Sequence, residues 1–144
     1  MNCERLSLVN LASVVRVGHL SLFETAIRSV VAPRLIEVGD AALLGCSLVQ
    51  QVEVPSLERL GRLSFYRCSS LRKLKLPASL EGLAFLSLGY CKSLESVEIH
   101  SGSNLVLDAG AFIGCEKVVV RSGSQQVRDY CIAHGIRCEY EEFH

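Results

Sequence analysis

Residues 60–77, LGRLSFYRCSSLRKLKLP, decide the fold, because close variants of this stretch recur along most of the chain. The variants are VGDAALLGCSLVQQVEVP (38–55), LAFLSLGYCKSLESVEIH (83–100) and LDAGAFIGCEKVVVR (107–121), and a fifth copy at 17–33 has threonine in place of the shared cysteine. Equivalent positions lie 21 to 24 residues apart. A repeat of this length predicts a solenoid, because one such coil cannot bury its apolar edge alone and must stack on its neighbours.

The second half of each copy has the pattern of a short strand. Apolar and polar residues alternate in Lys-Leu-Lys-Leu (73–76) and in Gln-Val-Glu-Val (51–54), which is the period of a half-buried strand. Pro77 and Pro55 follow directly and end the strand, since proline has no N–H to donate to a ladder. Equal register between copies predicts that these strands are parallel neighbours.

The first half of each copy places a small residue before a large apolar one. The glycines at the start of this half, Gly18, Gly39 and Gly61, are expected at turns that need unusual backbone angles. Only short helical or 3₁₀ turns are expected here, because so few residues do not sustain a regular helix. The small–large pairs are Ser21-Leu22, Ala42-Leu43, Ser64-Phe65, Ser87-Leu88 and Ala111-Phe112.

The joint pattern I-G-x-x-A-F-x-x-C-x-x-L-x-x-V-x-L-P is similar to that of the BspA-like leucine-rich repeat family over about residues 14–121. The resemblance implies a leucine-rich repeat solenoid, either of the α/β type or a mainly β right-handed superhelix with a short parallel sheet. It implies a curved surface that binds other proteins, often at cell surfaces or in large assemblies, with no catalytic residues and no cofactor. The chain departs from the family pattern at Thr25 and in the last copy, where the strand segment 118–120 is short.

One domain, residues 1–144, is expected, with about five coils in residues 14–121 and a C-terminal cap in residues 122–144. Residues 1–13 match the second half of a copy, so an incomplete first coil is expected there. That coil then either continues a longer protein or is covered by something else. The alternative is a degenerate strand that tolerates exposure.

The predicted cap is a helix followed by a strand. Val127, Tyr130 and Cys131 share one helical face, with Ser124 as the N-cap and Gly135 as the left-handed residue at the C-terminus. The sequence from residue 136 to residue 140 alternates as a strand, and the acidic tail at 141–142 is expected to fray.

Composition excludes several functions. Fifteen basic and fifteen acidic residues cancel, and no basic, aromatic-rich segment is present, which argues against nucleic-acid binding. No apolar run reaches the length of about 18 residues that predicts a membrane span. Without a secretory signal pattern, the sequence predicts an intracellular location, in a reducing compartment or an organelle interior, with the cell surface as the second possibility.

Five of the seven cysteines share one repeat position, which predicts a buried, reduced structural column. Cys131, His134 and Cys138 do not form a C-x-x-C pair, so no metal site is predicted. The column consists of Cys3, Cys46, Cys68, Cys91 and Cys115.

The remaining polar residues do not match any known catalytic arrangement, and an enzyme is not predicted. The four histidines fall at unrelated repeat positions, and neither a glycine-rich phosphate loop nor a nucleophile elbow occurs. Ser64 and Ser87 precede large core residues and are interpreted as small packing residues. His100 replaces the strand-ending proline and is expected to be an exposed turn residue.

Two surfaces are predicted to bind a partner protein. The first is an apolar stripe on the convex side together with the N-terminal coil. The alternative for the stripe is that its side chains pack inside the turns. The second is the polar row of the concave sheet, which equally well serves only solubility and cross-strand pairing. The stripe consists of Leu6, Val9, Leu20, Phe23, Leu44, Leu63, Tyr66, Phe85 and Leu86, and the sheet row of Gln51, Glu53, Lys73, Lys75, Ser96 and Glu98.

The sequence therefore predicts a non-catalytic protein–protein interaction module or a scaffold subunit of a larger assembly, which binds through the stripe. One alternative is a fragment of a cell-surface adhesin or ligand receptor that binds through the concave sheet. Another is an accessory structural subunit of a membrane-associated complex.

Overall fold

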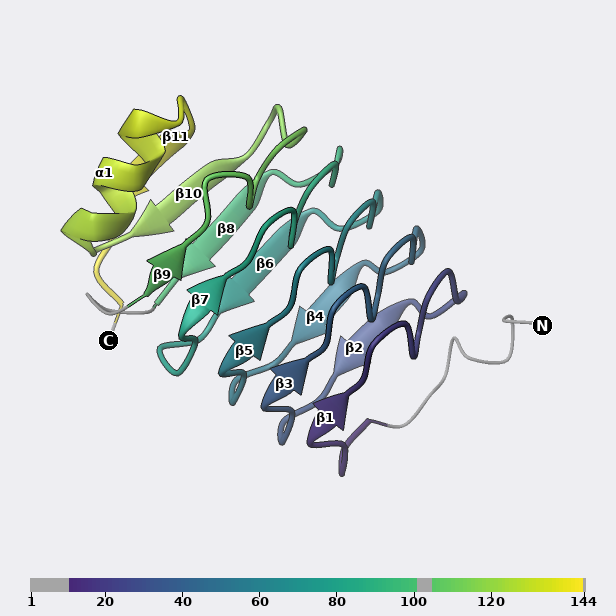
Figure 1. Cartoon of the computed structure of the whole chain (residues 1–144). Helices are drawn as coiled ribbons and strands as arrows, with labels where there is room; N and C mark the ends of the chain where they lie inside the picture. Colours follow the sequence, from purple (N-terminus) through teal and green to yellow (C-terminus); the bar gives the residue numbers. More distant parts are fainter. Residues whose placement is uncertain (1–10, 101–104, 144) are drawn as a thin grey trace.

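Each repeat forms one coil of a solenoid, and the coils stack in sequence order from the N-terminal to the C-terminal end (Figure 1). The computed structural model describes residues 11–100 and 105–143. Every complete coil contributes two strands, a short one and a longer one, on opposite sides of the core. The predicted parallel-sheet solenoid with a C-terminal helix and strand is confirmed.

The longer strands are those that the alternating pattern predicts. They pair in parallel in two groups, β2-β4 and β6-β8-β10-β11, and β4 and β6 lie side by side without ladder pairing. Lys75 is opposite Glu98, and Leu74 is opposite Val97 with both side chains buried, so the predicted register holds. These strands are β2 (Ser29–Val31), β4 (Gln51–Glu53), β6 (Lys73–Leu76), β8 (Ser96–Ile99) and β10 (Val119–Ser122). The last of these is as long as β6, so the expectation of a short final strand is wrong.

The shorter strands were not predicted. Each has two residues and lies directly before the glycine position of the repeat, and together they form a five-stranded parallel sheet in the order β1-β3-β5-β7-β9. Two residues are too few to show an alternating pattern in the sequence. These strands are β1 (Arg16–Val17), β3 (Glu37–Val38), β5 (Arg59–Leu60), β7 (Gly82–Leu83) and β9 (Val106–Leu107).

A series of overlapping turns, rather than a 3₁₀ helix, follows each short strand. In the third coil, Leu63 and Arg67 have φ angles of 57° and 61°, and a residue in this left-handed region interrupts any right-handed helix. The amides of Leu63, Phe65 and Arg67 instead donate to the carbonyls of residues 85, 87 and 89 in the next coil. We call this repeated set of inter-coil bonds the turn ladder.

The small–large pairs pack as predicted in all coils except the first. Ser64 and Phe65 are buried, as are their equivalents in the second, fourth and fifth coils. In the first coil Ser21 is exposed, with its hydroxyl donating to the Gly18 carbonyl, and Leu22 is half-buried. Large side chains therefore fill the interior while small ones let the coils approach.

Gly61 is required for a close approach between coils and not for an unusual φ angle. A Cβ atom at this position would lie 2.6 Å from Asp40 Oδ1 and 2.7 Å from the Asp40 amide nitrogen. Gly18, Gly39 and Gly61 are not among the residues with positive φ, so the expectation for this glycine position is wrong.

The cysteine column connects consecutive coils by hydrogen bonds. The thiols of Cys46, Cys68, Cys91 and Cys115 each donate to the carbonyl of the large residue of the previous coil, at distances of 2.8, 3.4, 3.1 and 2.9 Å. The described cysteines form no disulfide, and these four side chains are buried. Cys3 lies outside the described residues. Burial raises the pKa of Cys68, and a hydrogen bond with Cys115 together with burial raises the pKa of Cys91.

The cap consists of α1 (Gln125–Ala133) and β11 (Arg137–Tyr140). The Ser124 hydroxyl accepts from the Val127 amide, and Gly135 has a φ of 67°, so both predicted helix ends are confirmed. Val127 and Cys131 are buried against the last coil, and β11 extends the sheet beside β10.

Two expectations for exposed residues near the cap are wrong. The Glu141 amide donates to the Ser122 carbonyl, so the acidic tail is attached to the cap and does not fray. Phe143 stacks on the His100 ring at 3.7 Å between centroids, and His100 is half-buried instead of exposed. Pairing and stacking with the last long strands hold this segment in place.

Phe65→Ala is predicted to lower the free energy of unfolding by about 3–5 kcal/mol, because it leaves a cavity where a fully buried ring packs. Lys73→Ala, on the exposed face of β6, should change it by less than about 0.5 kcal/mol. Urea denaturation of both variants checks this, and equal effects would contradict the strand register.

Ser64→Ala is predicted to raise the free energy of unfolding by about 1 kcal/mol. The buried Ser64 hydroxyl has no hydrogen-bond partner among the described residues, and such a group is costly to bury. Ala42 and Ala111 occupy the same repeat position, so alanine fits it. The control is Ser21→Ala, which removes an exposed hydroxyl bonded to Gly18 and should bring no gain. Equal midpoints in urea for Ser64→Ala and the wild type would contradict the prediction.

Stability is predicted to fall above about pH 8.5. Unfolded thiols titrate near this value, whereas the pKa of Cys68 and of Cys91 is raised in the folded state, so high pH favours the unfolded chain. The loss is about 1.4 kcal/mol per thiol at pH 9.5. Urea denaturation between pH 7.5 and 9.5 should show a shallower dependence in Cys68→Ala than in the wild type. Identical pH dependences would contradict a thiol that burial keeps protonated at Cys68.

Candidate functional site

Apolar side chains emerge from the turns that follow the short strands. We call this surface the apolar turn face and define it by Leu20, Phe23, Leu44, Leu63, Tyr66, Phe85, Leu86, Tyr90 and Ile113. Leu20, Phe85 and Ile113 are each 45% exposed, which is high for large apolar residues in a repeat with so buried a core. Leu44, Leu63, Tyr66 and Leu86 are half-buried. In the third coil Leu63 and Tyr66 flank the buried pair Ser64 and Phe65, so they lie on the outer side of the turn.

Side chains from neighbouring coils meet on this face. The Tyr66 and Tyr90 rings make an edge-to-face contact with centroids 5.5 Å apart. A Cβ atom at Gly110 would lie 2.7 Å from the Phe85 ring and 3.1 Å from Ile113 Cδ1, so these two side chains cover the glycine from both sides. The face is therefore continuous across the third, fourth and fifth coils.

The backbone below this face is held in an uncommon conformation. Leu20, Leu63 and Leu86 have φ angles of 57°, 57° and 54°, and Tyr90 has one of 54°. A non-glycine residue in this region costs about 1–2 kcal/mol. Leucine and tyrosine are thus kept at positions where glycine would be the least strained residue.

Of the nine predicted stripe residues, seven lie on the apolar turn face. Leu6 and Val9 lie outside the described residues. Tyr90, which the sequence analysis missed, joins the face because Gly89 takes the preceding stripe position and leaves the neighbouring ring uncovered. An aromatic residue next to a glycine in the stripe column is the signal that could have found it.

The predicted polar row lies on the outer face of the longer strands. Lys73 is opposite Ser96, and Lys75 is opposite Glu98, while Gln51 and Glu53 lie on the neighbouring β4. The pairing also brings in Arg121 and Glu139, which the sequence analysis did not include, since Glu98 is opposite Arg121 and Arg121 is opposite Glu139. Acid and base therefore alternate from Glu53 through Lys75, Glu98 and Arg121 to Glu139, so the row carries little net charge.

The short-strand sheet forms the floor of an open trough of about 1020 Å³. Arg59 lies across it, with Nε 2.7 Å from Glu37 Oε2 and a second guanidinium nitrogen 4.0 Å from Glu81. These groups are well exposed, so the ion pairs contribute little stability. Phe85 lines both the trough and the apolar turn face.

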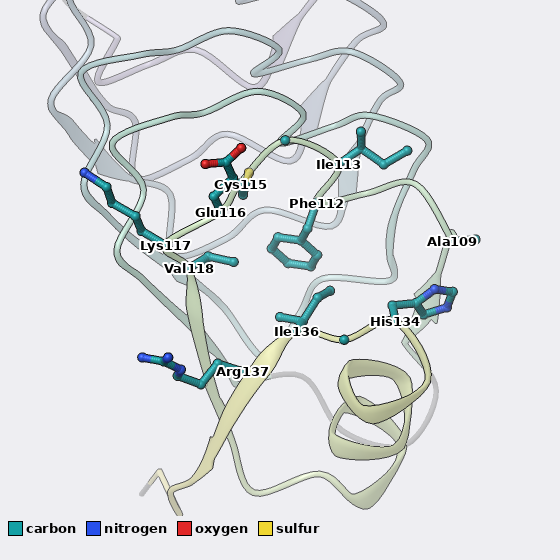
Figure 2. A pocket seen from close by; sticks show the side chains of 12 residues that line it. Ala109, Phe112, Ile113, Cys115, Glu116, Lys117, Val118, His134, Ile136 and Arg137 are labelled. Atoms are coloured by element: carbon teal, nitrogen blue, oxygen red, sulfur yellow. The ribbon is translucent and has the colours of Figure 1, made fainter.

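A cleft of about 790 Å³ separates the last turn from the end of α1 (Figure 2). Figure 2 shows the Phe112 ring and the Ile136 side chain facing each other across its centre, with Val118 beside them and Lys117 and Arg137 toward one rim. Burial raises the pKa of the nearby Tyr130 to about 12, and its hydroxyl donates to the Asp108 carbonyl. The cleft combines an apolar floor with a charged rim.

The described part of the chain holds no cluster of potential metal ligands. No group of three or more potential metal ligands occurs there, and Cys131, His134 and Cys138 do not form one. Burial and the neighbouring Cys138 raise the pKa of Cys131 to about 12, so this thiol is protonated at neutral pH. Within residues 11–100 and 105–143 no helix has the length and apolarity that crossing a membrane demands.

Comparisons with known proteins agree with this architecture. The family model for the BspA type leucine-rich repeat region matches residues 1–134 with six copies. A leucine-rich repeat protein from Bacteroides ovatus is similar in structure, with a TM-score of 0.57 and 16% sequence identity, over 92% of this chain and 46% of that one. The T. pallidum leucine-rich repeat protein is similar with a TM-score of 0.52 and 17% identity, over 95% of this chain and 84% of that one. At these identities the solved structures support the fold alone. No curated protein matches the chain in sequence.

The family match covers most of the chain, and the coils, the cysteine column and the parallel strands are those that its repeat pattern specifies. Repeats of this family generally act in protein interaction and not in catalysis. The chain belongs to the BspA-type leucine-rich repeat family.

Proposed function

We propose that the chain is a non-catalytic interaction module that binds a partner protein through the apolar turn face. The observation that carries the proposal is the gathering of Tyr66, Phe85, Leu86, Tyr90 and Ile113 around Gly89 and Gly110 and in the Tyr66–Tyr90 ring contact, with three of the five side chains 38–45% exposed. Tyrosine and phenylalanine are enriched at the centres of protein interfaces. A contiguous apolar patch of this kind on a protein surface favours an interaction site.

Backbone strain supports the same proposal. Tyr90 occupies a left-handed position at which Gly45 and Gly114 appear elsewhere in the repeat, and Leu63 and Leu86 occupy a second left-handed position. Stability alone favours glycine at such positions. Large apolar residues at these strained positions are consistent with a role in binding instead of folding, since they protrude from the turns.

The charged long-strand face is a weaker candidate. Acidic and basic residues alternate along it, and one such pair, Arg121 and Glu139, is in contact at 3.5 Å. Exposed pairs of this kind give a partner little net charge to recognise.

As a second candidate function, a cell-surface adhesin or receptor would use this face, and repeats of the BspA type are often surface-associated. A membrane-associated assembly would instead use the apolar turn face.

The N-terminal coil belongs to the proposal through Leu6 and Val9, which stay a prediction because they lie outside the described residues. The intracellular location likewise stays a prediction from the sequence.

Phe85→Glu combined with Tyr90→Glu is predicted to reduce partner capture at least tenfold. Both side chains are exposed, so charge is introduced at the centre of the proposed interface without entering the core. Quantitative pull-down from native extract compares the variant with the wild type, and circular dichroism should be unchanged.

The matched control is Lys73→Glu combined with Lys75→Glu, which introduces two carboxylates on the long-strand face. It should retain the partners that the wild type captures. Loss in this control with retention in the Phe85/Tyr90 variant would move the binding site to the long strands. Equal retention in both would contradict the proposal.

A further inference from the structure

The turn ladder ends unpaired at the last coil. In the fourth coil the Leu88 amide donates to the Ala111 carbonyl at 3.1 Å and the Tyr90 amide to the Ile113 carbonyl at 2.7 Å. The equivalent amides of the fifth coil are those of Phe112 and Gly114. Neither has an acceptor among the described residues, although both residues line the C-terminal cleft.

The cap covers other parts of the last coil. β11 takes the position of a sixth long strand beside β10, and Gln126 of α1 donates to the Leu105 carbonyl at 2.7 Å. The Gly110 amide, the first of the ladder set, is satisfied by Asp108 Oδ1 at 3.0 Å. A sixth coil would add a short strand beside β9, where α1 lies instead and donates from Gln126 and Tyr130 to the Leu105 and Asp108 carbonyls. It would also add a turn over Phe112 and Gly114, and no described residue takes the place of that turn.

The inner coils show which segment fits such a place. In each of them the two acceptor carbonyls belong to a small residue and to the residue two positions later, as with Ala42 and Leu44. The large apolar residue between them, here Leu43, points into the core. At the C-terminal end its place is lined by Phe112, Val118 and Ile136 (Figure 2).

We propose that this cleft binds a short segment of a partner protein with the pattern small–large apolar–any residue. The carbonyls of its first and third residues accept from the Phe112 and Gly114 amides, and its apolar side chain packs on Phe112, Val118 and Ile136. Lys117 and Arg137 outnumber Glu116 around the cleft, which favours an acidic residue beside the motif. The cleft shares Ile113 with the apolar turn face. None of the contacts assigned to the motif is made by Ile113, so this proposal does not depend on the other.

A second copy of the chain is not the expected occupant. Stacking its first complete coil in register on the fifth coil would place β2 where β11 already pairs with β10. Only a segment without an accompanying long strand fits over the Phe112 and Gly114 amides.

Amide hydrogen exchange, followed by NMR, tests the open ladder in the unbound protein. The Phe112 and Gly114 amides are expected to exchange at least 100-fold faster than those of Leu88 and Tyr90, which occupy the same repeat positions with acceptors. Similar protection of all four amides would overturn the proposal, because the ladder would then be closed.

A capped peptide with the sequence of residues 40–45, Asp-Ala-Ala-Leu-Leu-Gly, is the probe for binding. At millimolar concentration it is expected to slow exchange at Phe112 and Gly114 and to shift the resonances of Ile136. The control peptide carries Leu43→Asp and should do neither. Equal effects of both peptides, or of acetate at the same concentration, would overturn the proposal in favour of an anion site.

Ile136→Glu should weaken binding of the probe at least tenfold, because it places a carboxylate on the apolar floor. The matched control is Ile132→Glu, at a position of α1 that is 76% exposed and does not line the cleft, and it should bind as the wild type does. Equal binding by both variants would overturn the assignment. So would protection of Phe112 and Gly114 that grows with protein concentration in the absence of peptide, which marks self-association.

Discussion

Stacking of equivalent residues at the spacing of parallel strands is the constraint on which the whole structure depends. A coil of some 22 residues encloses too little apolar volume to be stable alone, so each coil is completed by its neighbours. Every position of the repeat then meets its own equivalent, and a residue type that stacks well in one coil is favoured in the next. The cysteine column shows this directly, since each thiol lies against a carbonyl of the coil before it. Cysteine is small, apolar and a weak donor, and the position requires all three properties.

The turns are the part of the coil where this constraint is most costly. Their amides alternate between an acceptor in the same coil and one in the next, which places Leu63 and Arg67 in the left-handed region. A free segment would relax, because the conformation is unfavourable for any residue except glycine. Inter-coil hydrogen bonds on both sides hold it in place. Strain and stacking are therefore linked, and the last coil, which has only one neighbouring turn, is the place where the ladder remains open.

Residues whose role repeats could be predicted from the sequence, whereas those defined by a single contact could not. The positions of Leu74, Val97 and the cysteines follow from period and alternation, and these were found with the correct register. The two-residue strands were missed because they are too short to carry a period, and the glycine position was misread because a close approach to Asp40 leaves no mark on the sequence apart from the glycine itself. Stacking of His100 on Phe143 joins distant segments without any repeat, so no local pattern predicts it.

The same distinction applies to the surface, where some positions are constrained by stacking between coils and others are not. Outward positions on the longer strands are still constrained, because a charge there must suit the residues on the neighbouring strands, and acid and base alternate from Glu53 to Glu139. Outward positions on the turns carry no such demand, so polar residues would serve there at least as well. Phe23, Phe85, Tyr90 and Ile113 are instead large, apolar and substantially exposed. Neither stacking nor solubility accounts for them, whereas the binding proposed for the apolar turn face requires large apolar residues at exposed positions.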